Sequence, residues 1–149
     1  MTFALDLKKF AEKAGKRADA AVGEIVTSIV RTVDERSPVG DAKYWKSPPP
    51  AGYVGGRFRA NWNLSLTAPD LSTTTAVDPA GDRTVTANLG AIPNQAAGLV
   101  YYLSNSLPYA TRLEMGWSRQ APQGIVRRTA VEFQGIVDKA VATAKRAVP

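Results

Sequence analysis

The amino-acid sequence predicts an α+β fold, in which a long N-terminal helix and a C-terminal helix pack on one face of a small, mainly antiparallel sheet. Two observations predict this fold: helical three- and four-residue periodicity near both ends of the chain, and strand-like alternation of apolar residues between them. The order helix, strands, helix is typical of a sheet that buries one face under helices. With 149 residues, we expect a single domain over residues 1–149 with one hydrophobic core.

Residues 5–33 are predicted to form the first helix, because apolar side chains recur there at helical spacing. The stripe consists of Phe10, Ala14, Ala18, Ala21, Val22, Ile25, Ile29 and Val33. Lysines such as Lys8 and Lys13 lie largely off this stripe and are expected on a solvated face. Ser37-Pro38 is expected to end the helix, because proline disfavours a helical conformation in the residue before it.

A long loop is expected over residues 38–56. It contains three consecutive prolines, which hold an extended backbone. Loops longer than about 12–15 residues in compact domains are usually functional or disordered. Tyr44, Trp45 and Tyr53 favour docking over disorder, so the loop is a predicted contact surface.

Three segments are predicted to form the sheet. "RFRANWNLSLT" (residues 57–67) alternates apolar and polar side chains and predicts a half-buried strand. "TVTANLGA" (84–91) repeats the pattern and predicts a second strand, and "LVYYLS" (99–104) predicts a third. Residues 68–83, which end in a Pro-Ala-Gly-Asp turn, are predicted to be a mobile hairpin tip between the first two strands.

A closing helix is predicted over about residues 124–148. Its apolar stripe consists of Val126, Ala130, Phe133, Val137, Ala140, Val141 and Ala144.

The composition argues against an enzyme. The chain has no histidine and no cysteine, so it lacks the commonest general base near neutral pH and any thiolate nucleophile. No glycine pattern for binding phosphates or dinucleotides is present, and the acidic residues are scattered. We therefore expect no catalysis, no cofactor and no metal. No apolar run approaches the roughly 20 residues that a membrane-spanning helix needs.

Glu114 is the one acid in an unusual setting, between Tyr109 and a loop rich in turn-forming residues. We expect it to pair with Arg57, Arg112 or Arg127, because a lone acid does little acid–base work. A second expectation is that its carboxylate accepts hydrogen bonds from an arginine or from backbone N–H groups near residues 116–118. It would then fix the loop that carries Gln120 and Pro122.

The net charge of +6 leaves two interpretations open: binding of an anionic partner, or solvated basic faces. Arg57, Arg59, Arg127 and Arg128 have no acid within three residues in the sequence. We expect most of these arginines to meet carboxylates of a neighbouring subunit. The alternative is a basic nucleic-acid-binding accessory module.

Three blocks of sequence carry a family resemblance: "SPVGD" (37–41), "GGRFRANW" (55–62) and "PYATRLEMGWSRQAPQGIVR" (108–127). In this order they resemble the tail-completion, or head–tail joining (neck), proteins of long-tailed bacteriophages, of the minor tail protein Z type. The resemblance spans essentially the whole chain, and the last block is the most specific. Residues 42–54 are a departure, since many members pass almost directly from the Pro-Val turn to Gly-Arg.

The resemblance implies a non-enzymatic virion structural protein at the head–tail junction, made in the cytoplasm of a host bacterium. It implies a ring of copies, expected to be a hexamer, between connector or portal-side proteins and the tail terminator or tail tube protein. DNA passes through the lumen with weak, non-specific contact at most, and no membrane is involved. We expect the isolated chain to be monomeric or weakly associated. Residues expected at interfaces or in their support are Tyr44, Trp45, Arg57, Arg59, Trp62, Tyr109, Glu114, Gly116, Trp117, Arg119, Gln120, Pro122 and Arg127.

Overall fold

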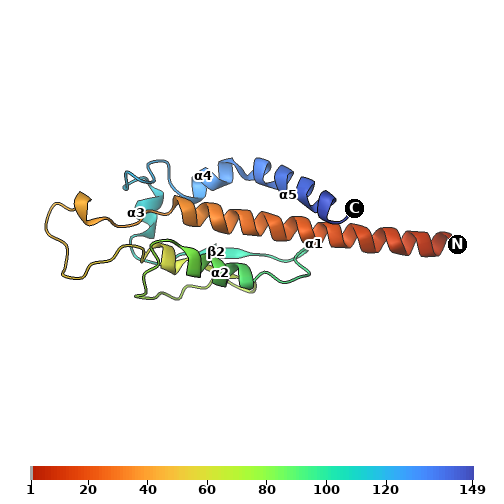
Figure 1. Cartoon of the computed structure of the whole chain (residues 1–149), viewed down its shortest axis with the longest axis horizontal. Helices are drawn as coiled ribbons and strands as arrows, with labels where there is room; N and C mark the ends of the chain where they lie inside the picture. The colour runs from red at the N-terminus through yellow and green to blue at the C-terminus, as the bar shows by residue number, and fades with distance from the viewer. Residues whose placement is uncertain (1) are drawn as a thin grey trace.

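The computed structural model, which describes residues 2–149, is an elongated α+β structure built along one helix (Figure 1). Helix α1 (Phe3–Arg36) is 34 residues long, so the predicted first helix is confirmed and extends further at both ends. It ends at Ser37, whose hydroxyl donates to the carbonyl of Val33 at 2.7 Å. Proline at position 38 then prevents continuation, as the sequence predicts.

Helix α1 separates two layers (Figure 1). On one side lie α4 (Val126–Val131) and α5 (Phe133–Ala147). On the other lie α2 (Asp82–Gly90) and a two-stranded antiparallel sheet, in which β1 (Asn63–Ser65) pairs with β2 (Tyr102–Ser104). Leu64 and Leu103 are directly opposite each other in this sheet.

The apolar stripe of α1 is buried only toward its C-terminal half. Val26, Val30 and Val33 are buried, whereas every residue from 2 to 16 is exposed, including Phe10 of the predicted stripe. The side chain of Arg17 donates to the carbonyl of Val148 at 2.7 Å, where the C-terminus meets the helix. The first four turns of α1 therefore project beyond the body of the protein (Figure 1).

The predicted second strand is wrong, because residues 84–91 lie mostly in helix α2. The Pro-Ala-Gly-Asp turn exists, with Gly81 at a φ of +82°, but it leads into a helix rather than a strand. Asp78 stabilises the first turn of this helix, since its carboxylate accepts hydrogen bonds from both the backbone N–H and the hydroxyl of Thr84, at 2.9 and 2.8 Å. Residues 68–83 are consequently not a hairpin tip.

The other predicted elements are shorter than expected. Only residues 63–65 of the first predicted strand pair with a neighbour, and residues 59–61 form a 3₁₀ turn, η2 (Arg59–Asn61). The third strand is confirmed but is limited to β2. The closing helix is interrupted at Glu132, where Arg36 donates both to Glu132 at 2.5 Å and to the hydroxyl of Thr129 at 3.1 Å.

Amide side chains replace much of the missing sheet. The buried Asn61 amide pairs with both backbone groups of Thr74: it accepts from the N–H at 2.8 Å and donates to the carbonyl at 3.1 Å. Asn88 of α2 accepts from the N–H of Leu64 at 3.0 Å and donates to the carbonyl of Trp62 at 2.9 Å. Each amide supplies the donor and acceptor that a neighbouring strand would otherwise supply.

The core lies where α1 ends. Its buried members come from distant parts of the chain: Val33, Phe58, Trp62, Leu107, Ala121 and Ile125. Trp62 satisfies its only polar atom by donating to the hydroxyl of Ser37 at 2.8 Å. No helix within residues 2–149 is both long and apolar enough to cross a membrane.

Candidate interaction surface at one end of the molecule

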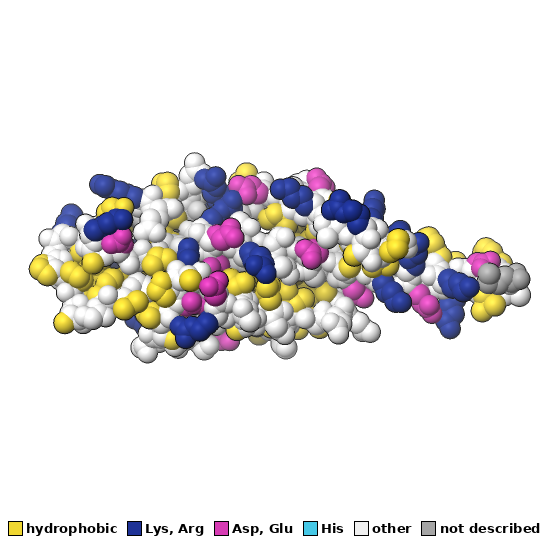
Figure 2. All heavy atoms as spheres, viewed as in Figure 1, with side chains coloured by type: hydrophobic (Ala, Val, Ile, Leu, Met, Phe, Trp, Pro, Cys, Tyr) yellow, Lys and Arg dark blue, Asp and Glu magenta, His cyan; other side chains and the backbone are white. Residues whose placement is uncertain are grey.

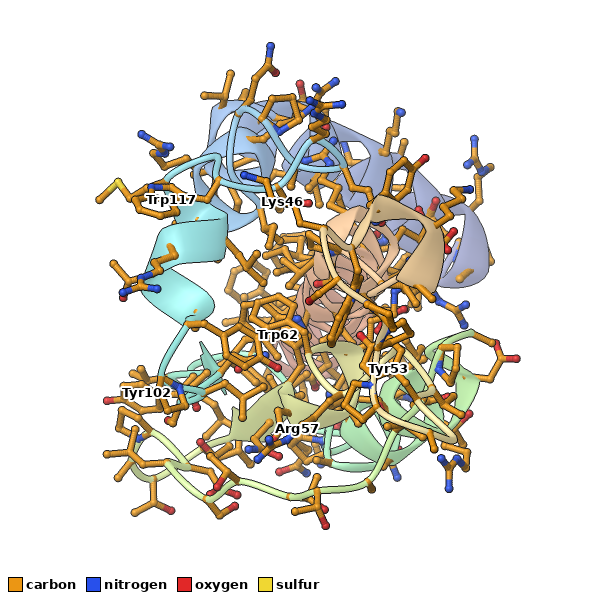
Figure 3. The ribbon with its side chains drawn as sticks, turned by 90° about the vertical axis from the view of Figure 1, so that its left-hand side faces the viewer. Lys46, Tyr53, Arg57, Trp62, Tyr102 and Trp117 are labelled. Atoms are coloured by element: carbon orange, nitrogen blue, oxygen red, sulfur yellow. The ribbon has the colours of Figure 1, made fainter. Side chains whose placement is uncertain are left out.

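Exposed aromatic side chains gather at the end of the molecule opposite the projecting helix. We call this region the end surface; its large side chains are Tyr44, Trp45, Tyr53, Tyr109, Met115 and Trp117. Figure 3 views this end, with Lys46 and Tyr53 on the loop of residues 38–56, Trp117 beside α3 (Ala110–Glu114), and Trp62 toward the centre. Aromatic residues and methionine on an exposed patch are typical of protein interfaces.

Contacts within the loop give it a defined shape. The ring centroids of Trp45 and Tyr53 are 4.7 Å apart. A short 3₁₀ turn, η1 (Ala42–Tyr44), is started by Asp41, whose carboxylate accepts from the N–H of Lys43 at 3.0 Å. These contacts are consistent with the prediction that the loop docks rather than being disordered.

Gln120 joins the two segments that form the end surface. Its side-chain amide accepts from the N–H of Val39 at 3.0 Å and donates to the Val39 carbonyl at 2.9 Å. Gly116 allows the second segment to turn close to itself: its φ is +85°, and a Cβ there would lie 2.4 Å from the carbonyl oxygen of Pro122. Gln120, Gly116 and Pro122 therefore shape the surface rather than offering side chains to a partner.

Glu114 holds the end of this segment to α4. Its carboxylate accepts three backbone hydrogen bonds, from Ile125 and Val126 at 2.9 Å and from Arg127 at 2.8 Å. The Arg127 guanidinium lies 3.7 Å away and donates to the Glu114 carbonyl at 2.7 Å. The expected pairing with Arg127 and backbone N–H groups is confirmed, but the donors lie at residues 125–127, not at 116–118, because these N–H groups open a helix.

Electrostatic effects on Glu114 favour its charged form. Burial acts to raise its pKa, but the three backbone hydrogen bonds and the Arg127 charge outweigh burial, so the pKa lies below its usual value. A carboxylate held in this way is a structural anchor.

Glu114→Gln is expected to lower the free energy of unfolding at pH 7 by about 2 kcal/mol, because an amide NH₂ replaces one accepting oxygen among three N–H donors. The loss should be measured by denaturant unfolding, with faster amide exchange at residues 115–127. Since the folded pKa is lowered, the difference from wild type should disappear as the pH falls through that value. Asp138→Asn, at an exposed acid on α5, is the control; an equal effect there would contradict this role.

Trp117 is the most exposed aromatic residue of the end surface, at 75%. The Arg112 guanidinium carbon lies 5.4 Å from the centroid of its ring, which holds the indole across the outside of α3. Tyr44 is 64% exposed and carries the Lys43 ammonium 4.8 Å from its ring centroid. Arg119 is exposed in the same loop. In a monomer these aromatic faces remain in contact with water.

Trp62 and Arg59 are structural. Trp62 is buried in the core. The Arg59 guanidinium donates to three backbone carbonyls, those of Pro79 at 2.8 Å and of Ser37 and Glu35 at 3.2 Å. Carbonyls from the end of α1 and the turn before α2 therefore converge on Arg59 within the chain, and the expected contact with a carboxylate of a neighbouring subunit stays a prediction.

The other three arginines also have partners within the chain. Arg57 donates to the carbonyl of Thr74, Arg127 contacts Glu114, and Arg128 contacts Gln123 and Glu132. A cavity of about 220 Å³ lies between Arg36 and Arg128 behind residues 120–124. Both arginines interact with Glu132, so this carboxylate offsets part of their charge. Among residues 2–149, no group of three acids that could bind a metal is found.

Sequence reasoning missed a buried acid behind the end surface. Asp34 is 5% exposed, and Gly81 packs so closely that a Cβ there would lie 1.9 Å from its Oδ2. Burial raises the pKa of Asp34 to about 6; the Arg59 charge opposes this, while Asp78, Glu35 and Asp82 add to it. Its Oδ1 has no hydrogen-bond partner among residues 2–149. The only sequence signal for the burial of Asp34 is its position on the buried stripe of α1, one turn before Pro38.

The surface thus has the features of a protein-binding face, with aromatic side chains held by neighbouring cations and an underlying frame of backbone hydrogen bonds. Comparison with protein-family models, with curated proteins and with solved structures finds no match for this chain.

Proposed function

We propose that this chain is a non-enzymatic structural protein of a long-tailed bacteriophage, located at the head–tail junction. Copies of it form a ring around the DNA channel, and the end surface contacts a neighbouring subunit or the next ring. The proposal places the protein between the connector and the tail tube. It explains the exposed aromatic residues of the end surface as contacts with a partner, and it requires no catalytic group.

One observation carries the proposal: the three sequence blocks that resemble neck proteins converge on residues 37–39. Trp62 and Arg59 of the second block donate to the hydroxyl and carbonyl of Ser37. Gln120 of the third block pairs with both backbone groups of Val39. The motif residues therefore form one connected frame beneath the end surface, which supports interpreting them as a single structural signature.

The parent particle provides the main test. Removing the protein from an infection should yield DNA-filled heads and complete but unattached tails, which electron microscopy of the lysate would reveal. Supplying the chain in trans should restore joined particles, whereas Trp117→Ala with Tyr44→Ala should restore far fewer, although both side chains are exposed and lie outside the core. Joined, infectious particles in the absence of the protein would reject the proposal.

The distribution of charge favours a structural role over the nucleic-acid module. On the face that Figure 2 shows, Lys and Arg are spread along the molecule and interspersed with Asp and Glu, with no continuous basic patch. A wall along which DNA must slide needs few phosphate contacts, because each phosphate neutralised strengthens binding at low salt.

We expect the purified chain to bind duplex DNA no more tightly than about 10 µM at physiological salt, within the range of non-specific binding. Fluorescence anisotropy with a labelled duplex would measure this. Arg57→Gln, at an exposed guanidinium with a single backbone contact, should change the affinity little. Submicromolar binding that this substitution abolishes would favour the nucleic-acid module instead. Arg59 is unsuitable for the comparison, since its loss would disturb the frame.

A further inference from the structure

The projecting part of α1 carries an apolar stripe that is left exposed by residues 2–149. Phe3, Leu7, Phe10 and Ala14 follow one another at steps of four, three and four residues, so they share one face of the helix. Phe3 is 81% exposed and Phe10 69% exposed. Figure 2 shows hydrophobic side chains at this tip of the molecule. We call Phe3, Leu7 and Phe10 the tip stripe.

The projecting turns of α1 would gain stability from a partner, because every residue from 3 to 16 is exposed. Most helical stability in proteins comes from tertiary packing of an amphipathic face. In a solvent-exposed helix, phenylalanine has a lower helix propensity than alanine. Two phenylalanines on one exposed face therefore indicate a contact that the monomer does not make.

An apolar groove lies elsewhere on the same chain. It has a volume of about 350 Å³ and lies between α1, β2, α4 and the start of α5, lined by Ile29, Val33, Leu103, Val126, Ala130 and Phe133. Val126 and Phe133 are each 47% exposed although they face core residues. A cavity of about 150 Å³ suffices for one benzene ring, so the groove has room for two side chains of the tip stripe.

The groove cannot be filled by the chain's own tip. Leu7 and Ile29 lie on the same unbroken helix, 22 residues apart in the sequence, which corresponds to about 33 Å along its axis. An α-helix does not fold back on itself, so an occupant from this sequence must come from another molecule.

We propose that the tip stripe of one copy docks in the apolar groove of a second copy. Each copy carries one tip and one groove, so the contact closes as a reciprocal two-fold pair, closes into a ring, or extends as an open chain; the ring is the form that the proposed function requires. The contact gives a physical form to the ring proposed above and in that respect rests on the proposed function, but its test concerns the purified chain alone.

The size of the contact predicts weak association. At about 200 Å² for a whole phenylalanine side chain, the tip stripe exposes roughly 400 Å², and a groove of matching area brings the total buried to roughly 800 Å². Stable, specific interfaces bury about 1,200–2,000 Å². A single contact should therefore form only at high concentration, on the order of 0.1–1 mM, and closure into a ring would strengthen it because every copy then makes two contacts.

Two variants with opposite defects provide the test. The first variant removes the apolar side chains of the tip stripe by combining Phe3→Gln, Leu7→Gln and Phe10→Gln. The second fills the groove by Ala130→Trp. All four substituted residues are exposed. In sedimentation experiments up to about 1 mM, we expect wild type to self-associate and each variant to stay monomeric. An equimolar mixture of the two should give a 1:1 complex and nothing larger, since one intact tip and one intact groove remain.

Leu5→Gln is the matched control, because Leu5 lies on the opposite face of the tip and is also exposed. It should self-associate like wild type. Wild type that stays monomeric at about 1 mM, variants that still associate, or an equal loss in the Leu5→Gln variant would each overturn the proposal.

Cross-linking offers a second measurement that leaves the groove lining otherwise intact. The chain contains no cysteine, so Leu7→Cys in one preparation and Val126→Cys in another should form mixed disulfide dimers on mild oxidation. Leu5→Cys with Val126→Cys should not, and equal yields from both mixtures would contradict the docking. If docking is found but heads and tails join without the protein, the contact stands and the head–tail assignment fails. The reverse result would reject the contact alone.

Discussion

Asp34→Asn is expected to stabilise the protein at pH 8 by up to about 3 kcal/mol and to change its stability little at pH 4. In the folded chain, burial raises the pKa of Asp34 from 3.8 to about 6. At about 1.4 kcal/mol per pH unit, ionising this carboxyl above pH 6 costs the folded state about 3 kcal/mol. Asparagine has nearly the same shape and carries no charge, so it removes this cost.

The sign follows from proton linkage. The folded state binds the Asp34 proton more tightly than the unfolded state does, so its contribution to stability is present below pH 3.8 and is lost as the pH rises through about 6. The relevant quantity is the difference between variant and wild type in urea unfolding at several pH values, because the titration of Glu114, Asp78 and other acids then cancels. Glu24→Gln, at an exposed acid on the same helix that does not contribute to the Asp34 shift, is the control. An Asp34→Asn variant that is less stable than wild type at every pH would contradict the assignment.

Asn61→Ala is expected to lower the free energy of unfolding by about 3–4 kcal/mol. The Asn61 side chain is 1% exposed and makes three hydrogen bonds, to the carbonyls of Arg57 and Thr74 and from the N–H of Thr74, at 2.7, 3.1 and 2.8 Å. Alanine leaves these backbone groups without their partners, and each unpaired buried group costs about 1–3 kcal/mol. Residues 66–77 should then detach from η2 before the core unfolds.

Urea unfolding and limited proteolysis within residues 66–77 would measure the two effects of Asn61→Ala. The matched control is Asn63→Ala, because Asn63 makes one side-chain bond, to the carbonyl of Ser72 at 3.1 Å, in an exposed setting. It should cost less than about 1 kcal/mol. If the two substitutions have similar effects, the Asn61 amide does not hold this segment.

The features that local sequence specifies were predicted well. The apolar period of α1, its end before Pro38 and the turn before Gly81 follow from the chemistry of neighbouring residues, and all three are present. The pairing of Glu114 with Arg127 and backbone donors was also predicted. Only the segment that supplies the donors was wrong, because the sequence does not reveal that α4 begins beneath the carboxylate.

The failures arise where partners are distant in the sequence. "TVTANLGA" alternates like a strand, but Asp78 starts a helix there and Asn88 faces β1. Val85, Asn88 and Leu89 are also spaced as on one face of a helix, so the sequence is as consistent with a helix as with a strand. No acid lies near Arg59 in the sequence, and the three carbonyls that its guanidinium contacts come from two other segments, which the sequence does not indicate. Such convergence becomes visible only in three dimensions.

The unbroken course of α1 makes the molecule a strut of fixed length. Thirty-four residues correspond to about 51 Å, with the tip stripe at one end and Ser37, which anchors the frame of the end surface, at the other. Deleting one residue from the projecting turns would rotate Phe3 by about 100° about the helix axis relative to the groove-lining face. Deleting seven would leave it within about 20° of its original direction but about 10 Å nearer the body. In the proposed docked arrangement, the number of residues in the projecting turns thus determines the distance between copies, and only changes of about seven residues keep their relative orientation.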